Sequence, residues 1–472
     1  MARNPQPDDR LGDYTADARL ITLSVMAALV GVISAFVALA LVRLIGLFTN
    51  LAYFHRFATS LVSPAASGPG LWSLPIPVVG GLIVGLLARY GSEKIRGHGI
   101  PEAMEAILIG RSRIEARVAV LKPLSSAIAI GTGGPFGAEG PIIATGGAFG
   151  SVFAQAFHLS PVERKTLLVA GAAAGMAAIF AAPVAAVLLA VELLLFEWKP
   201  RSFIPVACAA AVAAALRVPL LGAGPDFAIP PHHLLGATTL AECLGVGLVA
   251  GIAATLITNL LYAVEDGFAR LPIHWMWWPA IAGVVVGLGG LIAPRALGVG
   301  YDVIHDLVAG RLVGTFLLVL LVVKALIWAI GLGSGTSGGV LAPLLVMGGT
   351  MGALGRSILT EKLARRGRHV TREYGVNPLH VLRVEDVMEP PVAPRTAAVA
   401  PVVVYPDELL ETAMRKLLEH EVEVLPVSSP DDPGRVVGYV ERSALLGAWV
   451  QHTRDEHTRE EGWLGRLRRA SR

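Results

Sequence analysis

The sequence is poor in charge and almost free of cysteine. Charged residues make up 16% of the 472 residues, against about 25% in an average soluble protein. The two cysteines, Cys208 and Cys243, both lie in apolar runs, which excludes a secreted scaffold held by disulfides. A net charge of +3 is too small to indicate nucleic acid as a partner. The mean hydropathy of +0.62 instead indicates that most of the chain is embedded in a lipid bilayer.

The few charges are unevenly spread along the chain. Residues 361–472 hold 35 of them, whereas the first 360 residues hold 40. We therefore predict a membrane core over residues 20–366, a small cytosolic domain over 384–450 and a charged tail over 451–472. Residues 1–19 are polar and show no signal-peptide pattern, so we predict a disordered cytosolic lead.

Seven apolar stretches are candidates for membrane spans, each of which needs about 20 residues. They are residues 20–47, 74–87, 167–195, 203–221, 240–261, 278–293 and 312–330. Some are too short for a straight crossing and others too long. Between them lie apolar stretches rich in glycine and proline, at 97–101, 131–141 and 331–343. Irregular backbone at membrane depth survives only where it is buried in protein or lines an aqueous cavity, so we predict broken helices around a central site.

An internal repeat relates two of these regions. Residues 97–153 resemble residues 298–354 at an offset of 200 to 202, with Lys122 recurring as Lys324 and Pro141 as Pro343. Paired, interrupted segments in two halves are typical of a transporter with its site at the repeat interface. We place repeat 1 at about 20–220 and a shortened repeat 2 at about 236–366. The offset leaves open whether the halves are inverted, and a chance match of glycine-rich apolar sequence is the alternative.

Basic residues cluster in loops that the positive-inside rule places in the cytoplasm. The first cluster lies between two spans and the second follows the last span: Lys94, Arg96, Arg111, Arg113, Arg117 and Lys122, then Lys362, Arg365, Arg366 and Arg368. We therefore predict a multi-pass integral protein of the plasma (inner) membrane with both termini in the cytoplasm.

Each glycine-rich break ends in a proline and runs into apolar sequence, as the start of a helix does. We predict helices that begin near residues 102, 142 and 344. A helix N-terminus presents unpaired N–H groups and partial positive charge, so it attracts anions. Three such ends converging inside the membrane would bind a small anion, whereas a cation site would need several carboxylates, of which the spans hold few.

Glu139 is the ionisable residue in the second break. An ionisable residue at membrane depth is costly and points to a function. At the mouth of a helix its carboxylate would occupy the anion site itself and would leave on protonation, which describes a gate and a proton acceptor in one residue. The alternative is a glutamate that only caps its own helix.

The three breaks resemble the signature motifs of the CLC family of chloride channels and chloride/proton exchangers. They read Gly97-His98-Gly99-Ile100-Pro101, Gly137-Ala138-Glu139-Gly140-Pro141 and Gly339-Val340-Leu341-Ala342-Pro343. The resemblance implies an all-α fold of two inverted repeats, a homodimer with one anion pathway per subunit, chloride and possible proton transport, and Glu139 as the external gate. It also implies anion contacts from His98, Gly99, Ile100 and Gly140 and from the backbone amides of Val340 and Leu341.

Three departures from the family pattern concern protons and charge. His98 stands in place of a serine, so anion affinity becomes pH-dependent if the imidazole protonates; a neutral histidine bonded to backbone is the alternative. Leu193, after Glu192, stands where exchangers often carry a second proton glutamate, and Ala138 replaces an arginine beside Glu139. The sequence therefore does not decide between channel and exchanger.

A fourth departure is the length of repeat 2. The counterparts of about three helices are missing, and Leu359 stands where the family brings an anion-coordinating tyrosine. A truncated homologue that has lost transport and acts as a membrane scaffold or sensor is therefore an alternative function.

Residues 384–450 read as one small α/β unit that resembles a single CBS motif. Strands are expected near 402–404, 422–427 and 436–440, and helices over 407–419 and 443–449. Such motifs work in pairs, so one copy implies pairing across a dimer. The ribose-binding Thr-x-x-Asp of nucleotide-binding relatives is replaced by Val-Glu-Arg-Ser at 440–443, so we do not expect nucleotide binding.

An enzyme is the rival class, because Gly335-Thr336-Ser337-Gly338-Gly339 fits the Gly-x-Ser-x-Gly pattern of a serine hydrolase. Such a site needs a histidine base on another span. No histidine follows Ser337 until His369, outside the spans. We predict a protein that is not an enzyme and needs no cofactor.

Overall fold

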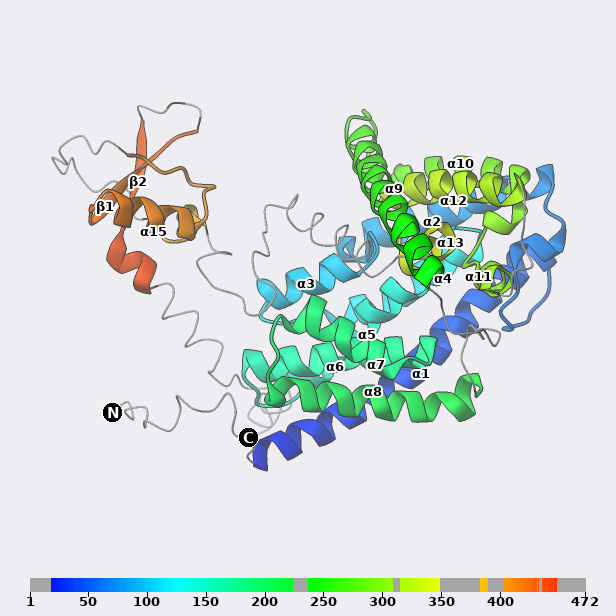
Figure 1. The fold of residues 1–472 in the computed structure, drawn as a ribbon, viewed down its shortest axis with the longest axis horizontal. Coiled ribbons are helices and arrows are strands. Elements are labelled where there is room, and N and C mark those ends of the chain that lie inside the picture. The colour runs from blue at the N-terminus through cyan, green and yellow to red at the C-terminus, as the bar shows by residue number, and fades with distance from the viewer. Residues whose placement is uncertain are drawn as a thin grey trace.

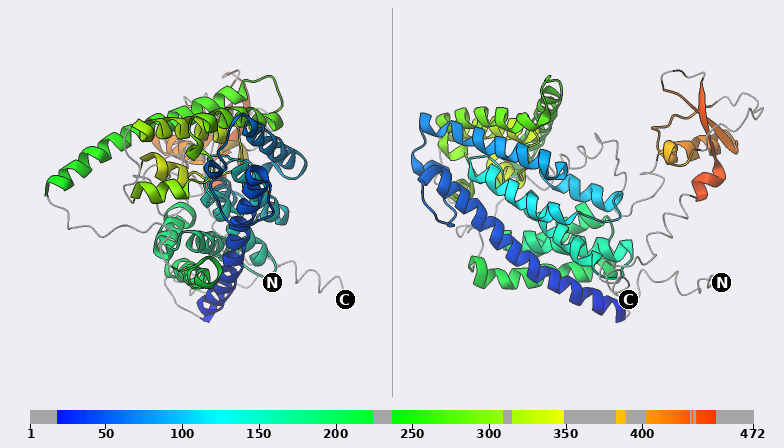
Figure 2. Two further views of the ribbon diagram at one scale, coloured as in Figure 1. Left: turned by 90° about the vertical axis from the view of Figure 1, so that its right-hand side faces the viewer. Right: turned by 180° about the vertical axis from the view of Figure 1, so that it is seen from behind.

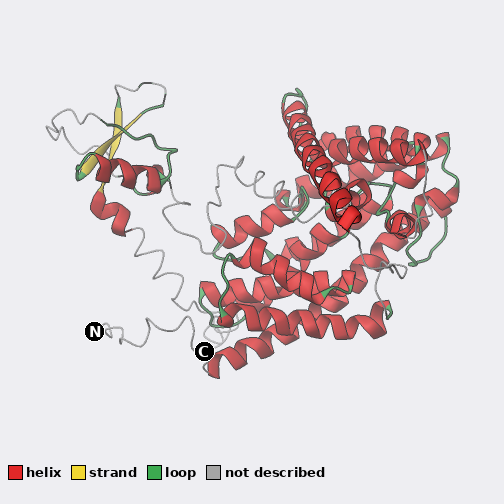
Figure 3. Ribbon diagram, viewed as in Figure 1, coloured by secondary structure: helices red, strands yellow, loops and turns green. Residues whose placement is uncertain are grey.

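The computed structural model describes residues 18–223, 237–308, 315–348, 383–388, 402–430, 432 and 435–447. This part of the chain is mostly helical, with a small two-stranded sheet toward its C-terminal end (Figure 3). The predicted lead, the tail over 451–472, the end of repeat 2 and Leu359 lie outside the described residues.

Repeat 1 holds eight described α-helices and a π turn. Their bounds are α1 Ala18–Phe54, α2 Pro75–Tyr90, α3 Ile100–Leu108, α4 Ala116–Gly131, α5 Glu139–Gln155, α6 Pro161–Phe180, α7 Pro183–Ala190, η5 Val191–Leu195 and α8 Pro200–Leu221. The described part of repeat 2 contains α9 Ala237–Ala269, η6 Trp275–Trp277, α10 Trp278–Ile292, η7 Pro294–Ala296, α11 Tyr301–Val308, α12 Thr315–Gly333 and α13 Leu341–Gly348.

Four helical segments of the described chain are long and apolar enough to cross a membrane. They are Ala18–Phe54, Leu71–Tyr90, Pro200–Leu221 and Trp275–Ile292. The candidate span over 167–195, which is too long for one straight crossing, divides into two helices, because the chain breaks between α6 and α7. Ala181 has a left-handed backbone with φ of 54°, and Pro183 then starts a new helix. A left-handed residue followed by proline cannot continue an α-helix.

Close helix contacts in the core depend on glycine. A Cβ added at Gly146 of α5 would lie 2.3 Å from the carbonyl oxygen of Gly171 in α6, and one at Gly171 would lie 2.2 Å from that of Gly146. The two backbones therefore touch, as small residues allow in membrane helices. Helix α6 packs against α5, α1 and α8 at the centre of repeat 1 (Figure 1).

Helices α2 and α10 show that the two repeats are inverted. Gly81 faces the carbonyl of Pro279, and its repeat counterpart Gly283 faces that of Pro77. Farther along, Gly85 faces Met276, and its counterpart Gly287 faces Leu74. Reciprocal contacts of this kind define a two-fold axis. Because residue numbers rise in α2 as they fall in α10, the helices are antiparallel, and the axis is perpendicular to them.

The C-terminal unit is a small α/β structure. Strands β1 Val424–Ser428 and β2 Val436–Glu441 pair in antiparallel fashion, and Val404 bridges to Val427 in parallel. Helix α15 Leu410–Glu419 packs its apolar face on this sheet, and residues 442–447 are helical. The buried side chains form a core of their own: Val384, Val404, Leu410, Ala413, Leu417, Leu425, Val427, Val440 and Leu445.

Candidate functional site

Backbone hydrogen bonds join the glycine-rich breaks of the two repeats. The N–H of Gly97 donates to the carbonyl of Gly335 at 3.2 Å, and the N–H of its counterpart Gly298 donates to Gly133 at 3.1 Å. All four glycines have φ between 68° and 100°, a left-handed conformation that favours glycine. The same backbone geometry is therefore built twice, once in each repeat.

Gly137 and Gly339 meet at the centre of this arrangement. The N–H of Gly137 donates to the carbonyl of Gly339 at 3.0 Å, and the reverse bond measures 2.8 Å. The two residues are repeat counterparts, so this reciprocal pair marks the pseudo-two-fold axis. Each glycine immediately precedes a helix start of its own repeat.

The structure brings the three predicted helix starts together. A Cβ added at Gly140, in the first turn of α5, would lie 1.9 Å from the carbonyl oxygen of His98 and 3.2 Å from Cα of Gly339. One at Gly99, where α3 begins, would lie 2.7 Å from the carbonyl oxygen of Gly140. Helices α5 and α13 begin at Glu139 and Leu341, three residues before the predicted starts. Glu139 is thus in the first turn of α5.

Glu139 reaches from α5 to the N-terminus of α13. Its side chain is fully buried, and its Oε1 accepts a hydrogen bond from the N–H of Ala342 at 2.9 Å. Its Oε2 is buried and has no hydrogen-bond partner among the described residues. Cβ atoms added at Gly137 and Gly339 would lie 1.6 and 2.5 Å from Oε2, so the two glycines leave the space that the carboxylate fills. The side chain of Glu139 therefore bonds to a helix of the other repeat, beyond any contact with the start of its own helix.

Two buried lysines occupy equivalent places in the repeats. Nζ of Lys122 donates to the carbonyls of Ile95 and Gly97 at 2.9 and 2.7 Å. Nζ of Lys324 donates to Ala296 and Gly298, both at 2.9 Å. Each lysine therefore holds the loop that enters the first break of its own repeat. The charge of Lys324 also acts on Glu139.

The remaining predicted site residues all lie at this junction. His98, Ile100 and Val340 are fully buried, as is Gly140, and Leu341 is half-buried. The N–H of Gly99, however, donates to Oε2 of Glu102 at 2.8 Å, so in this structure it is engaged with the side chain of its own helix. The sequence analysis missed this cap, although a glutamate three residues after the cap position is a known signal.

A second contact that the sequence analysis missed involves Arg96. Its guanidinium lies over the rings of Trp275 and Trp278, with 4.4 and 5.7 Å to the ring centroids. The tryptophans therefore hold a cation beside the break at Gly97. No spacing rule could have linked residues so far apart along the chain.

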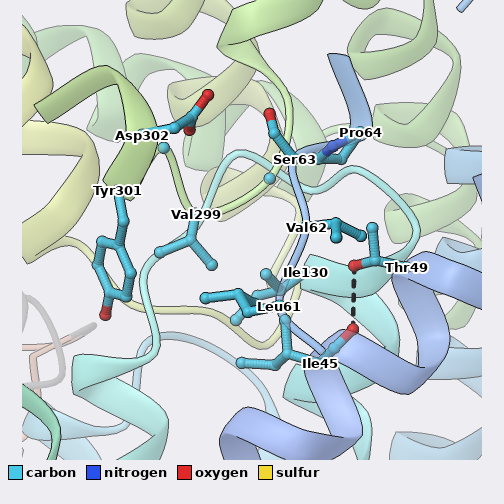
Figure 4. A pocket seen from close by; sticks show the side chains of 12 residues that line it. Ile45, Thr49, Leu61, Val62, Ser63, Pro64, Ile130, Val299, Tyr301 and Asp302 are labelled. Carbon is cyan, nitrogen blue, oxygen red and sulfur yellow. Dashed lines mark hydrogen bonds between the residues drawn. The ribbon is translucent and has the colours of Figure 1, made fainter. Parts of the chain in front are cut away.

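Cavities adjoin the symmetry-related loops. A large one of about 960 Å³ is lined by Lys94, Arg96, Gly97, Arg113 and Glu265, among others. A small one of about 110 Å³ is lined by Thr49, Ser63, Gly298, Gly300 and Asp302. Figure 4 shows the small cavity, with Tyr301 and Asp302 on one side and Ile45 and Thr49 on another; the Thr49 hydroxyl donates to the carbonyl of Ile45 at 2.9 Å. The antiparallel relation of the repeats places these loops toward opposite ends of the core.

The surroundings of Ser337 are not those of a nucleophilic serine. Its hydroxyl lies 2.7 Å from the hydroxyl of Ser126, on α4, and both side chains are fully buried. A serine pair without a base in contact has no means of activating the oxygen.

The family model described as "Voltage gated chloride channel" matches residues 80–370, and a CBS domain model matches residues 384–450. The chain belongs to the voltage-gated chloride channel (CLC) family. It is 33% identical to a voltage-gated ClC-type chloride channel ClcB of Salmonella typhimurium, over 70% of this chain and 80% of the relative. The corresponding channel of Citrobacter koseri is 31% identical, over 70% and 79%.

Solved structures share the fold. A slow cyanobacterial Cl⁻/H⁺ antiporter superposes with a TM-score of 0.60 at 21% identity, over 75% of this chain and 80% of that one. A CLC-type fluoride/proton antiporter gives 0.59 at 19% identity, over 75% and 83%. The protein is therefore an integral membrane protein of a family of channels and transporters, which are not enzymes.

Proposed function

We propose that this CLC protein conducts chloride or a similar small anion across the membrane along a pathway that Glu139 closes. The hydrogen bond from Ala342 to Glu139 carries the proposal. It puts a carboxylate at the positive end of α13, where a mobile anion would bind. Protonation neutralises the carboxylate and weakens this attraction, so the anion then takes its place.

The proposed path runs between the two cavities and past the junction. Four lysine and arginine residues line the large cavity, namely Lys94, Arg96, Arg113 and Lys122. By the positive-inside rule we infer that this cavity and both termini face the cytoplasm of a plasma (inner) membrane. The small cavity at Gly298–Gly300 then faces outside. His98, Gly99, Ile100, Gly140, Val340 and Leu341 would contact the anion in transit.

In the proposed mechanism, Glu139 is the residue that binds a proton. Leu193 is buried and apolar, so it cannot relay a proton from the cytoplasmic side. A family member built in this way works as a channel or as an exchanger that delivers protons by another route. The single CBS motif would pair across a homodimer, without nucleotide.

Chloride efflux from liposomes that contain the purified protein tests the proposal. We expect wild type to release chloride, and a His98→Ser variant to do so with an altered pH dependence. Chloride flux that drives protons uphill would identify an exchanger, and flux without proton movement a channel. A folded wild type that releases no anion would overturn transport and favour the alternative of a membrane scaffold or sensor, which the shortened repeat 2 supports.

A further inference from the structure

Lys324 of α12 places its charged end against the loop that connects α10 to α11. Its side chain is fully buried, and Nζ donates hydrogen bonds to the carbonyls of Ala296 and Gly298, both at 2.9 Å. The same atom is 3.6 Å from a Cβ added at Gly300. In both views of Figure 2 the yellow-green helices of repeat 2, α11 and α12 among them, lie above the green α8. A buried ammonium group that faces neutral carbonyls stays charged only if a negative group is near.

Asp302, in the first turn of α11, is a carboxylate at this loop. It follows Gly300 by two residues and lines the small cavity (Figure 4). Its Oδ2 lies 3.8 Å from Nη2 of Arg295, and this ion pair links the two ends of the loop whose middle contacts Lys324. The Asp302 side chain is 41% exposed, so its charge is solvated. Asp302 therefore combines an accessible position at the cavity with a place beside the buried lysine.

Two carboxylates act on this lysine. The charges of Asp302 and Glu139 both affect Lys324. In the proposed function, Glu139 is neutralised and moves when the pathway opens, whereas Asp302 stays at the cavity. Of the two, Asp302 then remains to balance the charge of the lysine. The equivalent position in repeat 1 is Pro101, so repeat 1 has no carboxylate at that place.

Apart from Lys324, the titratable groups that the structure describes near Asp302 come from its own helix and from the loop before it. Arg295 also pairs with Asp306, one turn farther along α11, and Nδ1 of His305 lies 3.9 Å from Oδ1 of Asp306. Tyr301 lines the same cavity, but its hydroxyl points away from the Asp302 carboxylate in Figure 4. Because Arg295 is shared between two carboxylates, it balances the charge of Asp302 only in part.

Building on the gate proposed for Glu139, we propose that Asp302 is a positioning residue that keeps Lys324 charged and thereby sets the pH at which the gate opens. Without the Asp302 carboxylate, the buried ammonium group would lose its proton to water more readily, because burial disfavours the charged form. The Glu139 carboxylate would then lose a favourable charge, and the gate would open at a higher external pH. The alternative is an aspartate that only stabilises the start of its own helix.

Chloride efflux at a series of external pH values tests this role, with the full-length protein reconstituted in liposomes. Asp302→Asn should raise the pH of half-maximal efflux by about one unit, in the same direction as Lys324→Met. The double variant should match Lys324→Met, because the carboxylate acts through the lysine. Asp306→Asn is the matched control, since it removes a carboxylate from the same helix and a partner of the same Arg295. It should leave the pH of half-maximal efflux close to that of wild type.

A pH of half-maximal efflux that is unchanged in Asp302→Asn would overturn the role of Asp302. So would one that falls, since the carboxylate would then act on Glu139 by direct repulsion. Melting temperatures give a second readout that needs no transport: Asp302→Asn should lower the melting temperature more in wild type than in Lys324→Met. An equal loss in both backgrounds would overturn the link between Asp302 and Lys324. Wild-type efflux that is absent or independent of pH would instead overturn the proposed function of Glu139.

Discussion

The two repeats of the membrane core match closely at their centre and differ at their periphery. At the centre, Gly97 and Gly298 make equivalent hydrogen bonds, and Lys122 and Lys324 hold equivalent loops. At the periphery, α1 is covered by α6 and α8, whereas α9 packs mainly on α12. The site is therefore built from contacts between the repeats, and its geometry does not require both repeats to be equally complete.

The largest difference between equivalent positions is expected at Gly137 and Gly339. The three atoms nearest to a Cβ at Gly137 all belong to the Glu139 carboxylate, which can swing away, whereas one at Gly339 also lies 2.5 Å from the carbonyl oxygen of Gly137. Gly339→Ala should therefore lower the free energy of unfolding by about 3 kcal/mol. Gly137→Ala should keep the wild-type melting temperature and release chloride without pH control. Thermal denaturation in detergent, together with efflux, measures both. Equal loss of stability in the two variants would contradict the account.

Substitutions of the two buried lysines should lower stability to a similar degree but should affect gating differently. Replacing either by methionine leaves buried carbonyls without a donor, so Lys122→Met and Lys324→Met should each cost about 2 kcal/mol of stability. The charge of Lys324 acts on Glu139, so Lys324→Met should shift the pH dependence of chloride efflux more strongly than Lys122→Met. The same pH shift in both variants would show that the lysines do not differ in the way proposed.

The contact between α2 and α10 contains a pair of equivalent glycines at which substitution should change stability. A Cβ at Gly85 would lie 2.0 Å from the carbonyl oxygen of Met276, whereas one at the equivalent Gly287 would lie 2.8 Å from that of Leu74. Gly85→Ala should therefore destabilise the protein by about 2 kcal/mol and Gly287→Ala by about 1 kcal/mol. Melting temperatures in the same detergent give the ranking, and a reversed order would be inconsistent with the structure.

The smallest effect is expected at a charged cluster of repeat 1, in the loop before α8. Burial raises the pKa of the Glu197 carboxyl. The charge of Lys165 and the hydrogen bond from Ser202 outweigh this, with smaller contributions from Arg201 and Lys199, so the pKa lies below its ordinary value. A carboxyl with a lowered pKa in the folded state stabilises the protein above its unfolded pKa and loses this effect as pH falls through the folded pKa.

Glu197→Gln should accordingly destabilise the protein near pH 7, by about 0.5 kcal/mol. The difference from wild type should shrink as pH falls below the ordinary carboxyl pKa. Melting temperatures across this range check the sign; a difference that grows toward acid pH would show that the carboxylate is not stabilising.

Much of this arrangement could be predicted from the sequence, because it rests on local chemistry. Glycine followed by proline marks a helix start wherever it occurs, so the three starts were expected, and the offset between Lys122 and Lys324 revealed the repeat. The offset alone did not predict the inversion of the repeats, since an offset contains no direction. The family resemblance implied the inversion, and the antiparallel contacts of α2 with α10 show it.

Contacts between distant residues account for what the sequence did not predict. The reach of Glu139 to Ala342 and the stacking of Arg96 on Trp275 join residues about 200 positions apart, and no periodicity encodes them. The break at Ala181 was missed because alanine rarely adopts a left-handed backbone, so it gives no signal of its own.

The most direct test of the account is the pH dependence of chloride efflux in wild type and in Glu139→Gln, reconstituted side by side. Glutamine keeps the shape of the side chain but cannot carry the charge that holds it at the N-terminus of α13. The account predicts that wild-type efflux rises as the external pH falls, and that Glu139→Gln loses most of this rise and keeps only the smaller contribution of His98. Glu192→Gln, at an exposed glutamate of the same repeat, is the control and should behave as wild type. A Glu139→Gln variant with wild-type pH dependence would contradict the assignment of Glu139 as the gate.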